Sequence, residues 1–85
     1  MTNKLKIFKK RLIYRASYRG TKEMDILLSA FVNKYINEFD ENLLVDLENF
    51  LNFEDEIIIN FYHFGIIKKK IDTNPISKLF KNFKI

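Results

Sequence analysis

The sequence predicts an all-α protein, a small bundle of four or five helices. Apolar residues recur at intervals of three and four in several successive segments, as they do along one face of a helix. No segment alternates polar and apolar residues with the period of two that marks a strand. A chain of 85 residues can enclose one modest core, so residues 1–85 should form a single helical domain. We expect residues 1–5 and about 68–85 to be less ordered than the rest.

The first helix is predicted over residues 4–18, where apolar residues follow helical spacing. They are Leu5, Phe8, Leu12 and Ala16. Basic residues occupy most other positions, and residues 1–19 contain seven basic side chains and no acidic one. We interpret the apolar stripe as core and the lysines as a solvated face. A helix that lies on a membrane surface is an alternative interpretation.

A corner between two helices is predicted at residues 19–25. Gly20 can adopt the left-handed conformation that ends a helix, and the Thr21 hydroxyl can accept a hydrogen bond from the next turn. Glu23 and Asp25 then lie in the first turn, where the helix dipole favours negative charge. This local explanation does not require Arg19, nor the aromatic and basic residues before it. The residues therefore suit either a structural corner or a binding corner. The residues left unexplained are Arg11, Tyr14, Arg15 and Tyr18.

The second helix has the strongest periodic signal and is predicted to be the central core helix. Its apolar positions are Met24, Leu27, Leu28, Phe31, Val32, Tyr35 and Ile36. Asp40 can cap a third helix. The apolar positions of that helix are Leu43, Leu44, Leu47, Phe50 and Leu51.

A fourth, short helix is predicted to end at Gly65 in a left-handed conformation. It is apolar almost all round, so it should be deeply buried or should offer apolar surface to a partner. Its apolar positions are Ile57, Ile58, Phe61, Tyr62 and Phe64. Asn74 followed by Pro75 predicts the start of a terminal helix. The apolar positions of that helix are Ile76, Leu79, Phe80 and Phe83.

The net charge of +4 conceals a segregation along the chain. Residues 20–67 contain two lysines and ten acidic residues, whereas residues 68–85 contain six lysines and one acidic residue. The basic ends can fold back on the acidic middle or can present a basic face to an acidic partner. The longest purely aliphatic runs, such as Ile57–Ile59, are far shorter than the roughly 20 residues that span a bilayer. We expect a soluble, intracellular protein.

The side chains that support catalysis are few. The chain has no cysteine, which excludes a disulfide scaffold, a thiol nucleophile and a cysteine-bound metal. His63 is the only histidine, and we interpret it as a packed or half-exposed residue rather than a base or a ligand. There is no glycine-rich phosphate loop. We therefore predict a binding protein, with no catalytic, cofactor-binding or metal-binding residues.

The residues around Gly20 carry a family resemblance. The pattern is Arg11-Leu12-x-Tyr14-Arg15-x-x-x-Arg19-Gly20-x-x-Glu23-x-Asp25-x-Leu27-Leu28-x-x-Phe31. Together with the leucine-rich third helix and the glycine-closed fourth, it resembles the succinate dehydrogenase flavinylation factors, the flavin assembly factors of complex II. The likeness covers residues 9–65.

The sequence departs from the family pattern in two places. Members usually have a basic residue directly before the Arg-Gly pair, where this chain has Tyr18. They usually have a tryptophan three residues before the closing glycine of the fourth helix, and this chain has no tryptophan. Tyr62 has that spacing from Gly65, and Phe61 is the other candidate for the substitution.

The resemblance implies an assembly chaperone that binds the flavoprotein subunit of succinate dehydrogenase, and in some bacteria that of fumarate reductase. Such factors promote covalent attachment of FAD to a client histidine, while the bond itself forms within the client. The resemblance thus implies a protein that is not an enzyme and binds no cofactor stably. At the corner, Arg19 would form charge-assisted hydrogen bonds with the client and Gly20 would permit close approach. Glu23 would accept from client donors or fix Arg19. The partner-binding surface would extend over Arg11, Tyr14, Arg15 and Asp25.

We expect the free protein to be a monomer that binds no nucleic acid and does not insert stably into a membrane. It would be cytoplasmic in a bacterium and would lie in the mitochondrial matrix in a eukaryote. The alternative is a small basic nucleic-acid-binding or antitoxin-like regulatory protein, suggested by the two basic ends. The acidic middle, and aromatic residues at core spacing, weigh against that alternative.

Overall fold

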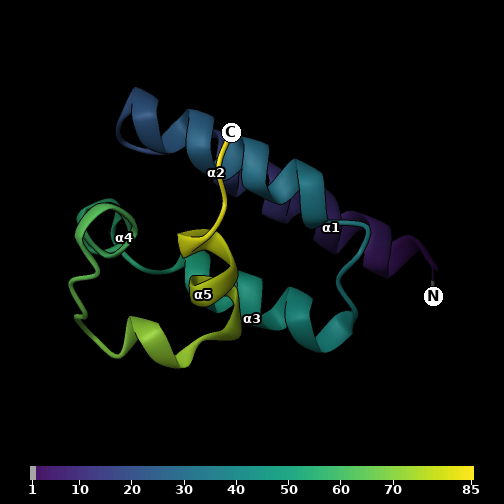
Figure 1. Cartoon of the computed structure of the whole chain (residues 1–85). Helices are drawn as coiled ribbons and strands as arrows, with labels where there is room; N and C mark the ends of the chain where they lie inside the picture. Colours follow the sequence, from purple (N-terminus) through teal and green to yellow (C-terminus); the bar gives the residue numbers. More distant parts are fainter. Residues whose placement is uncertain (1) are drawn as a thin grey trace.

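The computed structural model describes residues 2–85, which form five α-helices and one short 3-10 helix and contain no strand (Figure 1). The elements are α1 (Thr2–Ser17), α2 (Lys22–Tyr35), α3 (Glu41–Leu51), α4 (Asp55–Phe64), η1 (Ile71–Thr73) and α5 (Pro75–Lys81). The predicted all-α fold of four to five helices is confirmed. The short helix η1 was not expected from the sequence.

The helices pack in pairs around a shared core. α1 and α2 pack side by side and run in opposite directions along one side of the molecule (Figure 1). α3 packs against α1 and α5, while α4 packs against α5 and η1. Figure 1 shows α4 at one end of the molecule, beside the corner that joins α1 and α2. The tertiary structure thus places α4 next to the corner between α1 and α2, although the two segments are far apart in the sequence.

One hydrophobic core joins all five α-helices. At its centre, the Phe80 ring of α5 lies 5.2 Å from the Phe31 ring of α2 and 5.4 Å from the Phe50 ring of α3, measured between ring centroids. Such aromatic pairs add to the stabilisation from burial alone. On α1, the predicted stripe faces the core, because Leu12 and Ala16 are fully buried and Leu5 and Phe8 are partly buried against it.

Three predicted helix starts are confirmed by their hydrogen bonds, and the predicted end of α4 is confirmed by its backbone conformation. The Thr21 hydroxyl accepts from the backbone N–H of Met24 at 3.2 Å, and the Asp40 carboxylate accepts from Leu43 N–H at 2.8 Å. The Asn74 side chain accepts from Ile76 N–H at 2.8 Å, with Pro75 at the first helical position. Gly65 closes α4 with φ 69°, in the left-handed region that favours glycine.

The terminal helix differs from its predicted stripe. Ser77 is completely buried, whereas the predicted core residue Leu79 is 36% exposed. The reason is that α5 has only seven residues, and the side that it turns inward carries Ile76, Ser77 and Phe80. The buried Ser77 hydroxyl has no hydrogen-bond partner among the described residues. The core also contains Ile71 of η1, which the periodic pattern missed.

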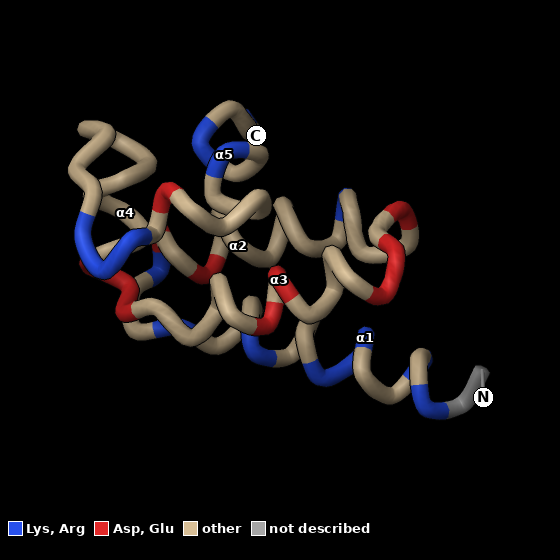
Figure 2. Tube along the Cα trace, turned by 90° about the horizontal axis from the view of Figure 1, so that it is seen from below, with Lys and Arg blue, Asp and Glu red and all other residues tan. Residues whose placement is uncertain are grey.

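The charge segregation of the sequence persists in three dimensions. Lys and Arg residues follow α1, and a further basic segment, residues 68–70, lies beside α4 (Figure 2). All acidic residues except Asp72 of η1 belong to α2, α3, α4 and the links between them. Among the described residues, two ion pairs join Lys or Arg to an acid, Arg19–Asp55 and Lys69–Glu54. The basic ends therefore keep most of their charge exposed to solvent.

Candidate functional site

The corner between α1 and α2 is fixed chiefly by Arg19. Its Nε donates to Asp55 Oδ1 at 2.7 Å, and its two terminal nitrogens donate to the carbonyl oxygens of Leu51 and Phe53, both at 2.9 Å. The side chain is only 11% exposed. The Arg19 backbone N–H also donates to the Asp25 carboxylate. In this structure the guanidinium therefore fastens the corner to the link between α3 and α4, with three of its donors used within the chain.

Gly20 is favoured by a close contact rather than by a left-handed backbone. Its φ lies outside the left-handed region, which among the described glycines only Gly65 adopts, so the predicted left-handed conformation is wrong. Its N–H donates to Asp55 Oδ2 at 2.7 Å. A Cβ atom at this position would lie 3.0 Å from the same oxygen, which is too close for an ordinary contact. The carboxylate can approach the backbone because residue 20 has no side chain.

Asp55 is the structural partner that sequence reasoning missed. It lies in the first turn of α4, where negative charge is favourable. It also accepts from both Arg19 and Gly20 through its two oxygens. These contacts join residues 36 and 35 positions apart, so no local sequence signal could have identified the pair.

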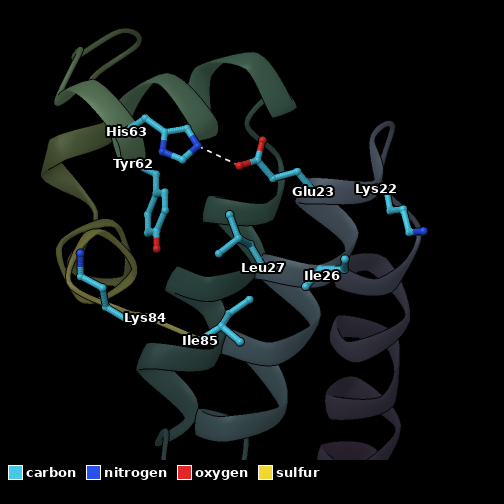
Figure 3. A pocket seen from close by; sticks show the side chains of 8 residues that line it. All are labelled: Lys22, Glu23, Ile26, Leu27, Tyr62, His63, Lys84 and Ile85. Atoms are coloured by element: carbon cyan, nitrogen blue, oxygen red, sulfur yellow. Dashed lines mark hydrogen bonds and ion pairs between the residues drawn. The ribbon is translucent and has the colours of Figure 1, made fainter.

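Glu23 points away from this cluster and pairs with His63. The Glu23 Oε2 atom lies 2.9 Å from His63 Nε2, and the two side chains are 56% and 41% exposed (Figure 3). The resemblance implied that Glu23 would either accept from client donors or fix Arg19. In the structure Arg19 is fixed by Asp55, and Glu23 does not contribute to that contact. Glu23 keeps its other oxygen available, because no hydrogen bond joins that atom to the described residues. His63 lies half-exposed at the surface, as predicted.

The Glu23–His63 pair lines an open groove of about 610 Å³ between the start of α2 and the end of α4 (Figure 3). We call it the α2–α4 groove. Its apolar lining comes from Ile26, Leu27, Tyr62 and Ile85. Figure 3 shows two lysines on opposite sides of it, Lys22 and Lys84. The groove can hold an apolar group between two positive charges, beside an exposed carboxylate that accepts hydrogen bonds.

Tyr62 belongs to this groove, whereas Phe61 does not. Phe61 is 5% exposed and contributes to the core. The Tyr62 hydroxyl donates to the Phe83 carbonyl at 2.7 Å, and its ring lies 5.2 Å from the His63 ring. Of the two candidates for the missing tryptophan, Tyr62 is the one that reaches the groove surface.

A second surface, the α1 face, carries the aromatic and basic residues singled out before the corner. Tyr14 and Tyr18 are 64% and 70% exposed, and their ring centroids are 4.5 Å apart. A smaller groove of about 400 Å³ on this face is lined by Ile7, Lys10, Arg11, Tyr14 and Arg15. Arg15 also donates to the Asn52 side chain at 2.6 Å, which ties α1 to the end of α3.

The predicted site residues thus separate into three groups. Glu23 lies in the α2–α4 groove, and Arg11, Tyr14 and Arg15 lie on the α1 face. Arg19, Gly20 and Asp25 form the internal bonds of the corner. Within residues 2–85, no three His, Asp or Glu side chains gather in a way that could hold a metal ion. None of the described helices is both long enough and apolar enough to cross a bilayer.

The fold and the groove define a small all-α protein with an open, mainly apolar groove on its surface. The sequence model of a family described as "Flavinator of succinate dehydrogenase" matches residues 10–84. The chain belongs to this family, and the resemblance seen in the sequence is confirmed.

Curated relatives agree with the family assignment. The chain is 37% identical over 81 residues to "Succinate dehydrogenase assembly factor 2, mitochondrial" of Scheffersomyces stipitis, covering 95% of this chain and 51% of that protein. It is 33% identical over 75 residues to the protein of the same name from Saccharomyces cerevisiae, covering 88% and 43%. The chain therefore spans about half the length of these relatives. No solved structure matches it significantly. The comparisons give no support to the nucleic-acid-binding or antitoxin-like alternative.

Proposed function

We propose that this protein is an assembly factor that binds the flavoprotein subunit of succinate dehydrogenase and promotes covalent attachment of FAD to it. The observation that carries the proposal is the family match over residues 10–84, which includes the corner and most residues of the α2–α4 groove and the α1 face. The curated relatives are named assembly factors of the same enzyme complex. The flavoprotein subunit of fumarate reductase is a second candidate client of the same class.

The α2–α4 groove is the proposed centre of the docking surface. Glu23 is 56% exposed there, so a donor from the client can reach its carboxylate. The apolar lining can hold a client side chain, while Lys22 and Lys84 favour acidic groups on either side. The exposed tyrosines of the α1 face, with Arg11, supply the residue types that are enriched at protein interfaces.

Arg19 and Gly20 support docking indirectly in this proposal. They hold the start of α2 against the start of α4 through Asp55, so they fix the relative position of the two helices that form the groove. The chain would then act by holding the client in an arrangement that permits attachment, and the bond would form among groups of the client. It would not bind FAD stably. It would work as a monomer, in the compartment where the client folds: the cytoplasm of a bacterium or the mitochondrial matrix.

In-gel flavin fluorescence of the denatured flavoprotein subunit tests the proposal. The client is produced in cells that lack their own factor and is supplied with the wild-type chain, with Glu23→Ala, or with Glu41→Ala. Glu41 is a matched control, because it is an exposed glutamate in the first turn of α3 and does not line the groove. We expect fluorescence with the wild type and with Glu41→Ala, and a strong loss with Glu23→Ala at an unchanged melting temperature.

Two outcomes count against the proposal. No fluorescence with the wild type, when the matching client is present and folded, would contradict the assembly function. Full fluorescence with Glu23→Ala would leave that function in place and remove the α2–α4 groove as its docking surface. Retention of the client on immobilised wild-type chain separates a binding defect from a defect after binding.

A further inference from the structure

Residues 64–70 form an exposed tip that the proposed docking surface does not use. Phe64 is the last residue of α4 and is 72% exposed, although most large apolar residues of that helix are buried. Ile66 and Ile67 follow it and are 42% and 56% exposed. Three large apolar residues within four positions are therefore open to solvent. We call residues 64–70 the α4 tip.

The apolar part of the α4 tip is followed directly by three exposed lysines, Lys68, Lys69 and Lys70. Figure 2 shows this basic segment beside α4. A fourth lysine, Lys81 of α5, lies close by, because its Nζ atom donates to the Phe61 carbonyl at 3.2 Å. One acidic partner is present: Glu54 accepts from Lys69 at 3.1 Å, with both side chains more than 60% exposed. The charge of the tip is therefore strongly positive.

The backbone of the tip also departs from ordinary geometry. Lys69 and Lys70 have φ 53° and 59°, the only non-glycine residues with positive φ in the described chain. This left-handed region disfavours side chains other than glycine, asparagine and aspartate. The chain thus keeps two lysines where glycine would be the least strained choice. Non-glycine residues in this region cluster at functional sites.

We propose that the α4 tip binds reversibly to the surface of an anionic phospholipid bilayer. The exposed Phe64, Ile66 and Ile67 would enter the boundary between headgroups and acyl chains, as the apolar residues of peripheral membrane proteins do. The lysines would remain at the level of the anionic headgroups, where each contributes favourable electrostatic energy. The tip would attach the protein to the membrane without inserting a helix across it.

A bilayer suits this surface better than an acidic protein does. The tip consists of a helix end and a loop, and its residues line neither of the two grooves described above. Its charge comes from lysines, whose ammonium groups act as hydrated point charges, rather than from arginines, which recognise carboxylates with two parallel hydrogen bonds. The apolar and the basic residues occupy adjacent positions along one short segment. Apolar residues beside lysines match a membrane surface, where the apolar acyl chains lie next to anionic headgroups.

Co-sedimentation of the full chain with vesicles tests the proposal. One set of vesicles is pure phosphatidylcholine, and the other is an equimolar mixture of phosphatidylcholine and phosphatidylglycerol. We expect binding to the mixed vesicles that weakens with added salt, and little binding to phosphatidylcholine alone. The variant Lys68→Gln/Lys69→Gln/Lys70→Gln should bind the mixed vesicles on the order of 100-fold more weakly, since each lysine near the surface contributes about fivefold.

Two further variants locate the effect. Phe64→Ser/Ile66→Ser/Ile67→Ser should lose at least about tenfold in affinity, because the apolar contact with the bilayer is removed. The matched control is Lys4→Gln/Lys6→Gln/Lys10→Gln, which removes the same charge from exposed positions of α1. It should reduce binding by much less than the triple change at the tip. Circular dichroism of each variant checks that the helices persist.

Several results would overturn the proposal. One is that the wild type does not bind the mixed vesicles, and another is that the tip variants bind them as well as the wild type does. The third result is that the α1 lysine variant loses as much affinity as the tip lysine variant, which would place any membrane contact on α1. A wild type that ignores vesicles but needs Lys68–Lys70 to retain the flavoprotein would assign the tip to a protein partner instead. The flavinylation assay is independent, because we expect the tip variants to remain active there and Glu23→Ala to bind vesicles normally.

Discussion

Replacing Arg19 by alanine should destabilise the fold more than any change on the proposed docking surface. The structure gives the guanidinium three acceptors: Asp55 at 2.7 Å, and the carbonyls of Leu51 and Phe53 at 2.9 Å. The side chain is 11% exposed and that of Asp55 is 24% exposed, so solvent replaces these bonds poorly. Removing one member of a largely buried charged pair leaves the other partners unsatisfied.

The expected loss follows from these contacts. Hydrogen bonds to charged groups contribute about 1.5–3 kcal/mol, and breaking a buried pair costs about 3–5 kcal/mol. Asp55 keeps its bond from Gly20 and its position at the start of α4, so the cost should lie at the low end of the range for a buried pair. We therefore expect Arg19→Ala to lower the free energy of unfolding by about 3 kcal/mol. In a domain of this size, that corresponds to a fall in melting temperature of about 12–24 °C.

Urea and thermal unfolding followed by circular dichroism measure this change. Arg11→Ala is the matched control, because it removes an exposed arginine of α1 and should alter stability by less than about 0.5 kcal/mol. Arg19→Lys should lose at least about half as much as Arg19→Ala, since one ammonium group cannot reach three separate acceptors. If Arg19→Ala and Arg11→Ala unfold together, the guanidinium does not fasten the corner and the reasoning is refuted.

Three smaller changes test other contacts. Gly20→Ala should cost about 1 kcal/mol, because the added Cβ meets Asp55 Oδ2 at 3.0 Å. Ser77→Ala should stabilise the protein by about 1 kcal/mol and raise the melting temperature by about 4–8 °C, because it removes a buried hydroxyl that has no partner. Tyr62→Phe should cost about 1 kcal/mol, because it removes the 2.7 Å bond to the Phe83 carbonyl.

The same unfolding experiments show when these expectations are wrong. Unchanged stability of Gly20→Ala would mean that the carboxylate can move aside, so that glycine is not needed there. Destabilisation by Ser77→Ala would show that the hydroxyl has a partner after all. A stable Tyr62→Phe variant would mean that the chain after α5 is not held by this bond.

The helices and their ends could be predicted because the interactions that define them are local. Thr21, Asp40 and Asn74 each cap a helix by bonding a backbone N–H two or three residues ahead, so neighbouring sequence contains both partners. The apolar spacing likewise identified the buried side of α2, which includes Phe31. The segment around Ser77 was predicted less well, because a helix of seven residues has too few turns to define one face by spacing.

The all-α fold, the helix caps and the family pattern around Gly20 could be read from the amino-acid sequence, because each depends on residues close together in the chain. The contacts of those pattern residues depend instead on how the helices pack. Arg19 and Glu23 are four positions apart, yet one is bound inside the chain to Asp55 and the other lies in an exposed groove beside His63. Their partners come from α4, 36 and 40 positions along the chain. The packing of α4 against the corner sets these contacts, and no pattern within a single helix encodes how two distant helices meet.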